Sequence, residues 1–412
     1  MKDLHELLDG PASQREKLDA VRARAPELRA LPDAELHELV RAFRRRVNSP
    51  KLAKDVNGLI AELTAGRGPA PARPARPIAA AVAFVGTRPG DVRGEELEAV
   101  VAADPDAPGP CEVLGDHLMS AGDVFGELIA TGLALAKDAK HKAMRRRWDE
   151  LQEARRDEIW GALAPHLRSH IGDAEWRNGF VRSCRACDYP LSPLSLADAL
   201  RALLDEPGPG RFLAALELDD LCAGALEPAF AVLAVRPRPT LRRLALVCHE
   251  AMLDPLARLG TALPDLRELD LQVMGLHLGS LAAPRLESLA IDLFDPEEPW
   301  NALAAIEPVL AGASAPALRR LTLRSFPDGD ELVRRCAEAP LLAQLTHLDL
   351  RGGTIGEDGA ACIRTHRERF AHLEVLALDE NYLPDGALAD LPRATLADQR
   401  PPELDRRPLD WE

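Results

Sequence analysis

The side chains best suited to metal or redox chemistry in this sequence are Cys184 and Cys187, which are spaced as Cys-x-x-Cys. Such a pair can ligate zinc or form a redox disulfide, but a structural zinc site usually takes four ligands. No second cysteine pair lies near it in the sequence, and Cys184 falls on an apolar position of a predicted strand. We therefore predict a packed thiol, with zinc or redox chemistry as the alternative.

Other fragments of catalytic motifs are incomplete. The segment VGTRPGD at 85–91 follows an apolar run, but it has neither a GxxxxGK[ST] nor a GxGxxG pattern, and Pro89 lacks a backbone donor. We interpret it as a turn that ends a strand, with a phosphate site as the alternative. The His-Glu pairs at 5–6, 37–38 and 249–250 do not extend to HExxH, and the serines lack a GxSxG context. The sequence thus predicts no enzyme, no metal and no cofactor.

A basic run at 137–147 ends in three consecutive arginines and is followed directly by acids at 149–153. Alternating blocks of opposite charge are typical of a solvated helix face. We adopt that interpretation; contact with an acidic partner or a nucleic acid is the alternative.

The overall composition limits the classes of partner. The formal net charge is −15, and residues 180–412 alone carry 24 Lys+Arg against 37 Asp+Glu. This excess of acids repels phosphate backbones, so nucleic acid is an unfavourable ligand for that region. The first residues lack the apolar core of a signal peptide, and no apolar run is long enough to span a membrane. Isolated cysteines are typical of reduced thiols, so we predict a cytoplasmic protein.

The second half of the chain repeats the pattern apolar-x-x-apolar-x-apolar. Successive copies start 28, 25, 20, 32, 27 and 28 residues apart. This period is typical of stacked supersecondary units, in which no unit buries its apolar face alone. We predict that each copy is a short strand, joined to its parallel neighbour through a helical return. Helical returns are predicted at 196–204, 253–263, 300–310, 331–339 and 359–370. The copies lie at 213–218, 241–246, 266–271, 286–291, 318–323, 345–350 and 373–378.

The rest of the chain divides by composition. An α-rich cap is predicted before the repeats, with one long charged helix over 141–163. A degenerate first strand is predicted at 181–186. The predicted organisation is a small helical module at 1–65, a Pro/Arg-rich linker at 66–77, the cap at 78–179, the repeat arc at 180–395 and a C-terminal tail at 396–412.

The hexapeptides and their returns resemble leucine-rich repeats of the long type seen in ribonuclease-inhibitor-like proteins, over about 180–390. The nearest matches are TIGEDGA at 354–360 and Asn381. The resemblance implies that the Asn381 side chain satisfies backbone groups of the turns. It also implies an α/β solenoid of parallel strands with helical returns. Earlier repeats lack this asparagine, so we expect irregular turns there.

Upstream, residues 95–190 resemble the bacterial repeat-companion domain that precedes leucine-rich repeats. The segment WRNGFV at 176–181 matches the exit of that domain into the first repeat. The resemblance implies a structural N-terminal cap and carries no established activity. The other matching positions are Asp104, Pro105, Asp106, Asp116, Leu118, Gly122, Asp123, Gly126, Glu127 and Ile129.

Polar residues between the leucines are the candidate binding site. In a stacked parallel sheet, equivalent positions of neighbouring strands form rows about 4.8 Å apart. Arg324 and Arg351 would then be neighbours and repel each other, unless an acid of this chain or of a partner lies between them. The predicted partner-binding residues are Asp270, Gln272, Asp292, Arg320, Arg324, His347, Asp349, Arg351 and Asp379.

These observations predict a non-catalytic scaffold or regulator that binds a protein partner on the concave face of the arc. Residues 1–65 are expected to dock a second partner or to self-associate. One alternative is the accessory or substrate-recognition part of an enzyme system, with the activity in residues 1–180. A weaker alternative is nucleic-acid contact by the basic segment 41–77, which would require binding that falls steeply with salt.

Overall fold

The structure is a computed structural model of the 412-residue chain, which divides into two compact units: Met1–Pro77 with Glu412, and Ile78–Trp411. In the first unit, the described helices are α2 (Gln14–Ala23) and α3 (Ala25–Leu28). The other helices predicted for 1–65, the linker 66–77 and the segment 85–90 lie outside the described residues. The structure describes residues 14–28, 59, 91–188, 194–205, 208–220, 225–248, 260, 262–273, 283–293, 302–312, 315–384, 386–388 and 393–400.

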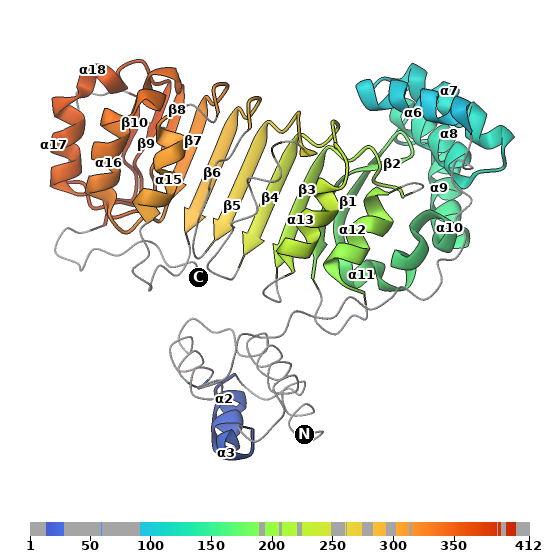
Figure 1. Ribbon diagram of the computed structural model, residues 1–412, viewed down its shortest axis with the longest axis horizontal. Coiled ribbons are helices and arrows are strands. Elements are labelled where there is room, and N and C mark those ends of the chain that lie inside the picture. The colour runs from blue at the N-terminus through green and yellow to red at the C-terminus, as the bar shows by residue number, and fades with distance from the viewer. Residues whose placement is uncertain are drawn as a thin grey trace. The chain divides into compact units, whose positions relative to one another are not determined.

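The second unit is built on one sheet, whose described strands number ten and follow one another in chain order (Figure 1). From β2 onward each strand runs parallel to the next, whereas β1 pairs antiparallel with β2. The strands are β1 (Ile171–Arg177), β2 (Phe180–Cys187), β3 (Ala215–Asp220), β4 (Arg243–Cys248), β5 (Glu268–Val273), β6 (Ser288–Leu293), β7 (Arg320–Arg324), β8 (His347–Asp349), β9 (Val375–Ala377) and β10 (Ala394–Thr395).

The predicted strands pair in the register that the hexapeptide pattern requires. Alternate residues point to opposite faces of a strand, so a leucine at every second position forms a buried row. Each residue of the central row pairs with its equivalent in the next strand, and all are buried. This row is Cys184, Leu216, Leu244, Leu269, Leu289, Leu321, Leu348 and Leu376.

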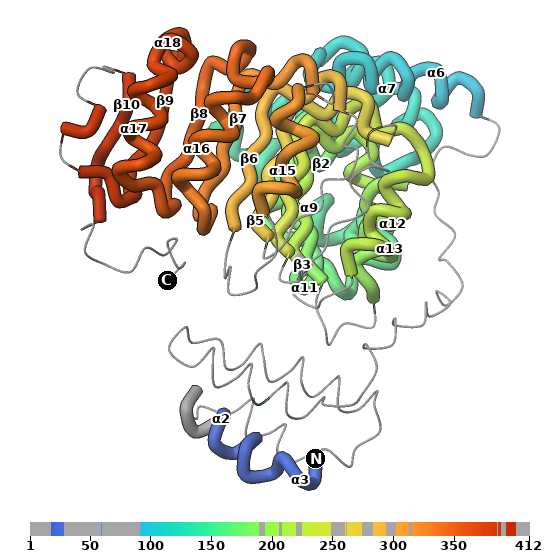
Figure 2. Tube along the Cα trace, turned by 60° about the vertical axis from the view of Figure 1, so that its left-hand side comes forward, coloured from blue at the N-terminus to red at the C-terminus, as the bar shows by residue number. Residues whose placement is uncertain are grey.

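Helices lie on the side of the sheet where the leucines are buried, and neighbouring helices contact one another, α12 with α13 and α16 with both α15 and α17. Figure 2 shows α15, α16 and α17 next to one another alongside their strands. The helical returns predicted at 196–204, 300–310, 331–339 and 359–370 are confirmed with small shifts at their ends. Most of the return predicted at 253–263 lies outside the described residues. The elements are α12 (Leu196–Leu204), α13 (Leu226–Ala234), α15 (Ala302–Leu310), α16 (Gly329–Glu338), η3 (Pro340–Gln344), α17 (Glu357–Thr365) and α18 (Arg367–Phe370).

Helices also precede the sheet. Asp91 and Asp123 are N-caps, because their carboxylates accept from the backbone N–H groups of Gly94 and Phe125. At Gly126, an added Cβ would lie 2.3 Å from the Met119 nitrogen, so only glycine permits this approach of two helices. The elements are α6 (Val92–Ala103), α7 (Pro108–Ser120), α8 (Val124–Lys137), α9 (Lys142–Ala154), α10 (Arg156–Trp160), η2 (Gly161–His166) and α11 (Leu167–His170).

One prediction for this region is wrong, and one strand was not predicted. The single helix over 141–163 is interrupted at Arg155 and continues as α10 and then as a 3-10 turn, although Trp148, Leu151 and Ile159 are buried. The strand predicted at 181–186 is β2, the first of the parallel strands, but the sequence pattern did not predict β1, which precedes it and pairs with it antiparallel. Tertiary contacts favour this additional strand: Trp176 packs edge-on against Trp148 and Trp160, with ring centroids 5.3 and 5.5 Å away.

Candidate functional site

The polar face of the sheet, opposite the helices, is the candidate site, and we call it the open face. Its residues alternate with the buried leucines, and on β4 and β5 they are half-buried or exposed. The predicted rows are in register where strand pairing is described. One row is Glu217, Ala245, Asp270, Ala290, Thr322, Asp349 and Ala377; a second is Asp219, Val247, Gln272, Asp292 and Arg324; a third includes Arg243, Glu268, Ser288, Arg320 and His347.

Arg324 and Arg351 are held by one carboxylate of this chain. Asp349 Oδ2 accepts from Arg324 Nη2 at 2.6 Å and Nε at 3.1 Å, and Arg351 donates to both oxygens at 2.8 and 2.9 Å. Burial would raise the pKa of Asp349, but the hydrogen bonds from Arg351 and Arg324 outweigh it and hold the pKa below its usual value. The acid that the two arginines require is therefore supplied internally.

The other predicted basic residues also have partners on the open face. Glu268 lies 3.6 Å from Arg320 and 3.9 Å from Arg243, so it bridges strands β4, β5 and β7. The Nδ1 atom of His347 lies 2.9 Å from the Thr346 hydroxyl. These side chains are spread over separate strands and do not converge on one pocket.

Sequence reasoning missed a further group at the start of the sheet. Arg185 Nε lies 3.1 Å from Glu217 Oε1, and its Nη2 contacts Asp219. Asp219 leaves only 2 % of its side chain exposed. Residue spacing could have revealed the pair, because Arg185 and Glu217 are register partners, but the leucine pattern is degenerate in β2.

The remaining predicted binding residues, three aspartates and Gln272, differ in accessibility. Asp292 is buried and accepts from the Ser325 hydroxyl at 2.9 Å, so its carboxylate supports the turn after β7. Asp379 accepts from the Thr395 hydroxyl at 2.6 Å and from the Ala397 N–H, which ties β10 to the sheet. Gln272 is exposed, and Asp270 is half-buried. Of these four side chains, only those of Gln272 and Asp270 take no part in these intramolecular hydrogen bonds.

The turn asparagine behaves as the resemblance implied. Asn381 is fully buried, and its Nδ2 donates to the carbonyls of Leu350 at 2.9 Å and Leu378 at 3.0 Å. Its Oδ1 accepts from the Ile355 N–H at 3.0 Å. One side chain thus satisfies backbone groups of two successive turns.

A buried ion pair that the sequence did not indicate joins the helices to the sheet. Arg211 Nε lies 3.1 Å from Glu98 Oε1 on α6, and the two side chains are 5 % and 10 % exposed. The Arg211 guanidinium also lies over the rings of Phe125 and Phe180, 4.5 and 4.7 Å from their centroids. These residues are far apart in sequence, so no local pattern identifies them.

The two cysteines of the Cys-x-x-Cys motif lie on β2. Burial raises the pKa of the Cys184 thiol to about 12, and burial is also the main reason that the pKa of Cys187 is raised. A raised pKa disfavours the thiolate that zinc binding or disulfide exchange requires. Within the ranges that the structure describes, no group of three or more His, Cys, Asp or Glu side chains is placed to hold a metal ion.

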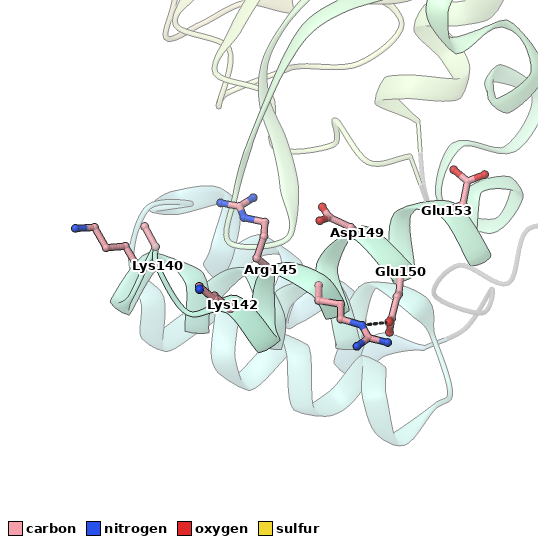
Figure 3. A pocket seen from close by; sticks show the side chains of 8 residues that line it. Lys140, Lys142, Arg145, Asp149, Glu150 and Glu153 are labelled. Carbon is pink, nitrogen blue, oxygen red and sulfur yellow. Dashed lines mark hydrogen bonds and ion pairs between the residues drawn. The ribbon is translucent and has the colours of Figure 1, made fainter.

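Lys142 and the three arginines of the basic run lie on an exposed face of α9, with Lys140 in the preceding turn, beside a shallow hollow (Figure 3). Lys140 and Lys142 are at one end of this face and Glu153 is at the other, and the labelled side chains point outward from the helix. Arg146 pairs with Glu150 at 2.8 Å. Two acids in the part of the chain before α9, Asp91 and Asp123, have perturbed pKa values, and both serve as helix caps.

Comparisons with known proteins add little to this geometry. No protein-family model matches the chain, and no curated protein matches it. Among solved structures, it is similar to a structural-genomics protein from Bacteroides fragilis, with a TM-score of 0.37, 15% identity, and coverage of 49% of this chain and 70% of that one. Among the described residues, no helix is long and apolar enough to cross a membrane.

Proposed function

We propose that residues 180–395 form a leucine-rich-repeat solenoid whose open face binds a protein partner, and that the chain acts as a non-catalytic scaffold or regulator. The observation that carries this proposal is the register of the open face. Equivalent polar side chains from strand after strand stand in rows, which provide a broad surface. Wide surfaces of this kind suit a protein better than a small molecule.

The leucine-rich-repeat assignment is supported by the hexapeptide strands, their helical returns and the Asn381 turn. In this proposal the helices from α6 to α11 act as the N-terminal cap that a repeat-companion domain provides. A cap is needed because the first repeat of a solenoid has no neighbour to bury its apolar side. The buried contact between Arg211 and Glu98 fits that role.

The electrostatics of the open face favour a partner with mixed charge. Arginines and carboxylates neutralise one another in local groups around Asp349, Glu268 and Arg185, so the face presents no continuous positive surface for a nucleic acid. A cytoplasmic location agrees with the thiols of Cys111, Cys184, Cys187, Cys336 and Cys362, which form no disulfide. Residues 1–65 would dock a second component or self-associate.

The proposal is tested by photocrosslinking in the native cell. A photoreactive amino acid at Gln272, on the open face, is expected to capture a discrete partner protein, whereas the same amino acid at the exposed Asp358 on α17 is not. The double substitution Arg324→Glu and Arg351→Glu should abolish the Gln272 crosslink, with Gln272→Arg as a milder variant for the purified complex. Identical capture from both positions, or capture that neither variant weakens, would show that the open face is not the binding site.

A further inference from the structure

Asp270 is the exception among the acids in the middle of the open face. It lies on β5 between its register partners Ala245 and Ala290, and it is half-buried. Within the described part of the chain, no hydrogen bond or ion pair reaches its carboxylate. By contrast, Glu217, Glu268 and Asp349 each contact at least one arginine.

The neighbours of Asp270 leave room for an incoming side chain. In its row, alanines occupy both adjacent strands, so the two side chains directly beside Asp270 are methyl groups. Strands β4 and β6 lie about 10 Å apart, twice the usual strand spacing. An extended aliphatic side chain could lie over either alanine and end at the Asp270 oxygens.

The nearby arginines of this chain are engaged elsewhere. Arg243 lies beside Glu268, and Arg324 donates to Asp349. Burial raises the pKa of Asp270, and the charges of Arg243 and Arg324 only partly oppose it. The carboxylate has therefore lost hydration without gaining a hydrogen-bond donor in return, which is an unfavourable state that a bound cation would relieve.

We propose that Asp270 receives a lysine or arginine side chain of the protein partner, which enters over Ala245 or Ala290. This inference rests on the proposed function of the open face and specifies the chemistry of its partner. A charged donor is favoured over a neutral one because charge-assisted hydrogen bonds to a carboxylate are about twice as strong. A metal ion is disfavoured because it requires several ligands, and no such group includes Asp270 among the described residues.

The experiment uses a random dodecapeptide display library selected on the full-length chain. Selected peptides are sorted by whether Ala245→Trp, which obstructs the open face, abolishes their binding. Those that bind the open face are expected to share a lysine or arginine, and Asp270→Asn should weaken them about 10- to 100-fold. The matched control Asp149→Asn removes a carboxylate from the exposed face of α9 and should leave the affinity unchanged.

A double-mutant cycle then tests the contact itself. Replacing the shared arginine by citrulline, or the lysine by norleucine, should weaken binding to the wild-type chain but have almost no further effect on Asp270→Asn. If peptides bind the open face but lack a shared cation, or if the two substitutions are additive, the Asp270 contact is wrong while the proposed binding face stands. If no selected peptide is sensitive to Ala245→Trp, both proposals are overturned.

Discussion

The carboxylate of Asp349 accepts two hydrogen bonds from the guanidinium of Arg324, both through Oδ2, at 2.6 and 3.1 Å. The same carboxylate binds Arg351, so a single acid compensates two arginines on adjacent repeats. An arginine held in this way has a fixed orientation and needs little reordering when a partner arrives. The intramolecular pairing therefore prearranges part of the proposed binding surface.

Substitution Asp349→Asn is expected to lower the free energy of unfolding by about 1–2 kcal/mol at neutral pH, because it removes the counter-charge that two arginines share at a partly exposed site. The folded-state pKa of Asp349 lies below its usual value of 3.8, so its contribution is complete above that pH and is lost as the pH falls through the lowered pKa. Urea unfolding of both proteins over a pH series measures the difference. A difference independent of pH would refute the charge interaction.

Substitution Asn381→Ala should destabilise the last repeats by about 2–4 kcal/mol, because several buried backbone groups lose their partners together. Hydrogen exchange should show reduced protection at Ile355, whose N–H donates to Asn381 Oδ1. Asn381→Asp keeps this acceptor but loses the donor to Leu350 and Leu378, so it separates the two halves of the interaction. Unchanged exchange at Ile355 in the alanine variant would contradict this role.

Substitution Arg211→Met is expected to cost about 3–5 kcal/mol of stability, since it leaves Glu98 as a buried charge without its main counter-ion. Glu98→Gln should also destabilise the protein. The double variant Arg211→Met with Glu98→Gln should lose less than the sum of the single losses, because both charges of the pair are then removed together. Chemical unfolding of the four proteins provides the cycle, and strict additivity would argue against a coupled pair.

The thiols of Cys184 and Cys336 are expected to resist alkylation by iodoacetamide at pH 8 in the folded protein. Burial raises the pKa of each to about 12, so only about one molecule in ten thousand carries the thiolate at that pH. Mass spectrometry of digests, with and without urea, measures the labelling. Labelling of folded Cys184 as fast as in urea would revive the redox or metal interpretation of the Cys-x-x-Cys motif.

Much of the sheet could be predicted from the sequence because its information is local and repeated. The leucines of each hexapeptide predict both the strand and its buried face. Equivalent positions in successive hexapeptides then predict that Gln272, Asp292 and Arg324 are in register. The role of the Asn381 side chain was predictable for a different reason, the resemblance of its turn to those of leucine-rich repeats. The pattern also placed Arg324 and Arg351 next to each other and predicted that an acid of this chain or of a partner lies between them.

Features that depend on contacts between distant residues could not be predicted. Strand β1 has no repeated leucines, and its formation depends on pairing with β2 and on the packing of Trp176. Arg211 and Glu98 are ordinary charged residues until the chain brings them together. The sequence also could not distinguish Asp270 from Asp292, because their different accessibility follows from the side chains around them and not from their spacing.

The irregular strand β1 affects whether the sheets of two molecules of this protein can pair edge to edge. It lies at one end of the strand order, and its ladder with β2 shifts register between Gly172 and Glu175 and again before Trp176, with Asp173 at a φ of 49°. An irregular edge offers no straight row of N–H and C=O groups to a strand of another molecule. The edge strand of a parallel sheet can otherwise pair with strands of other molecules and so build a fibre. The irregular β1 disfavours such pairing at this edge.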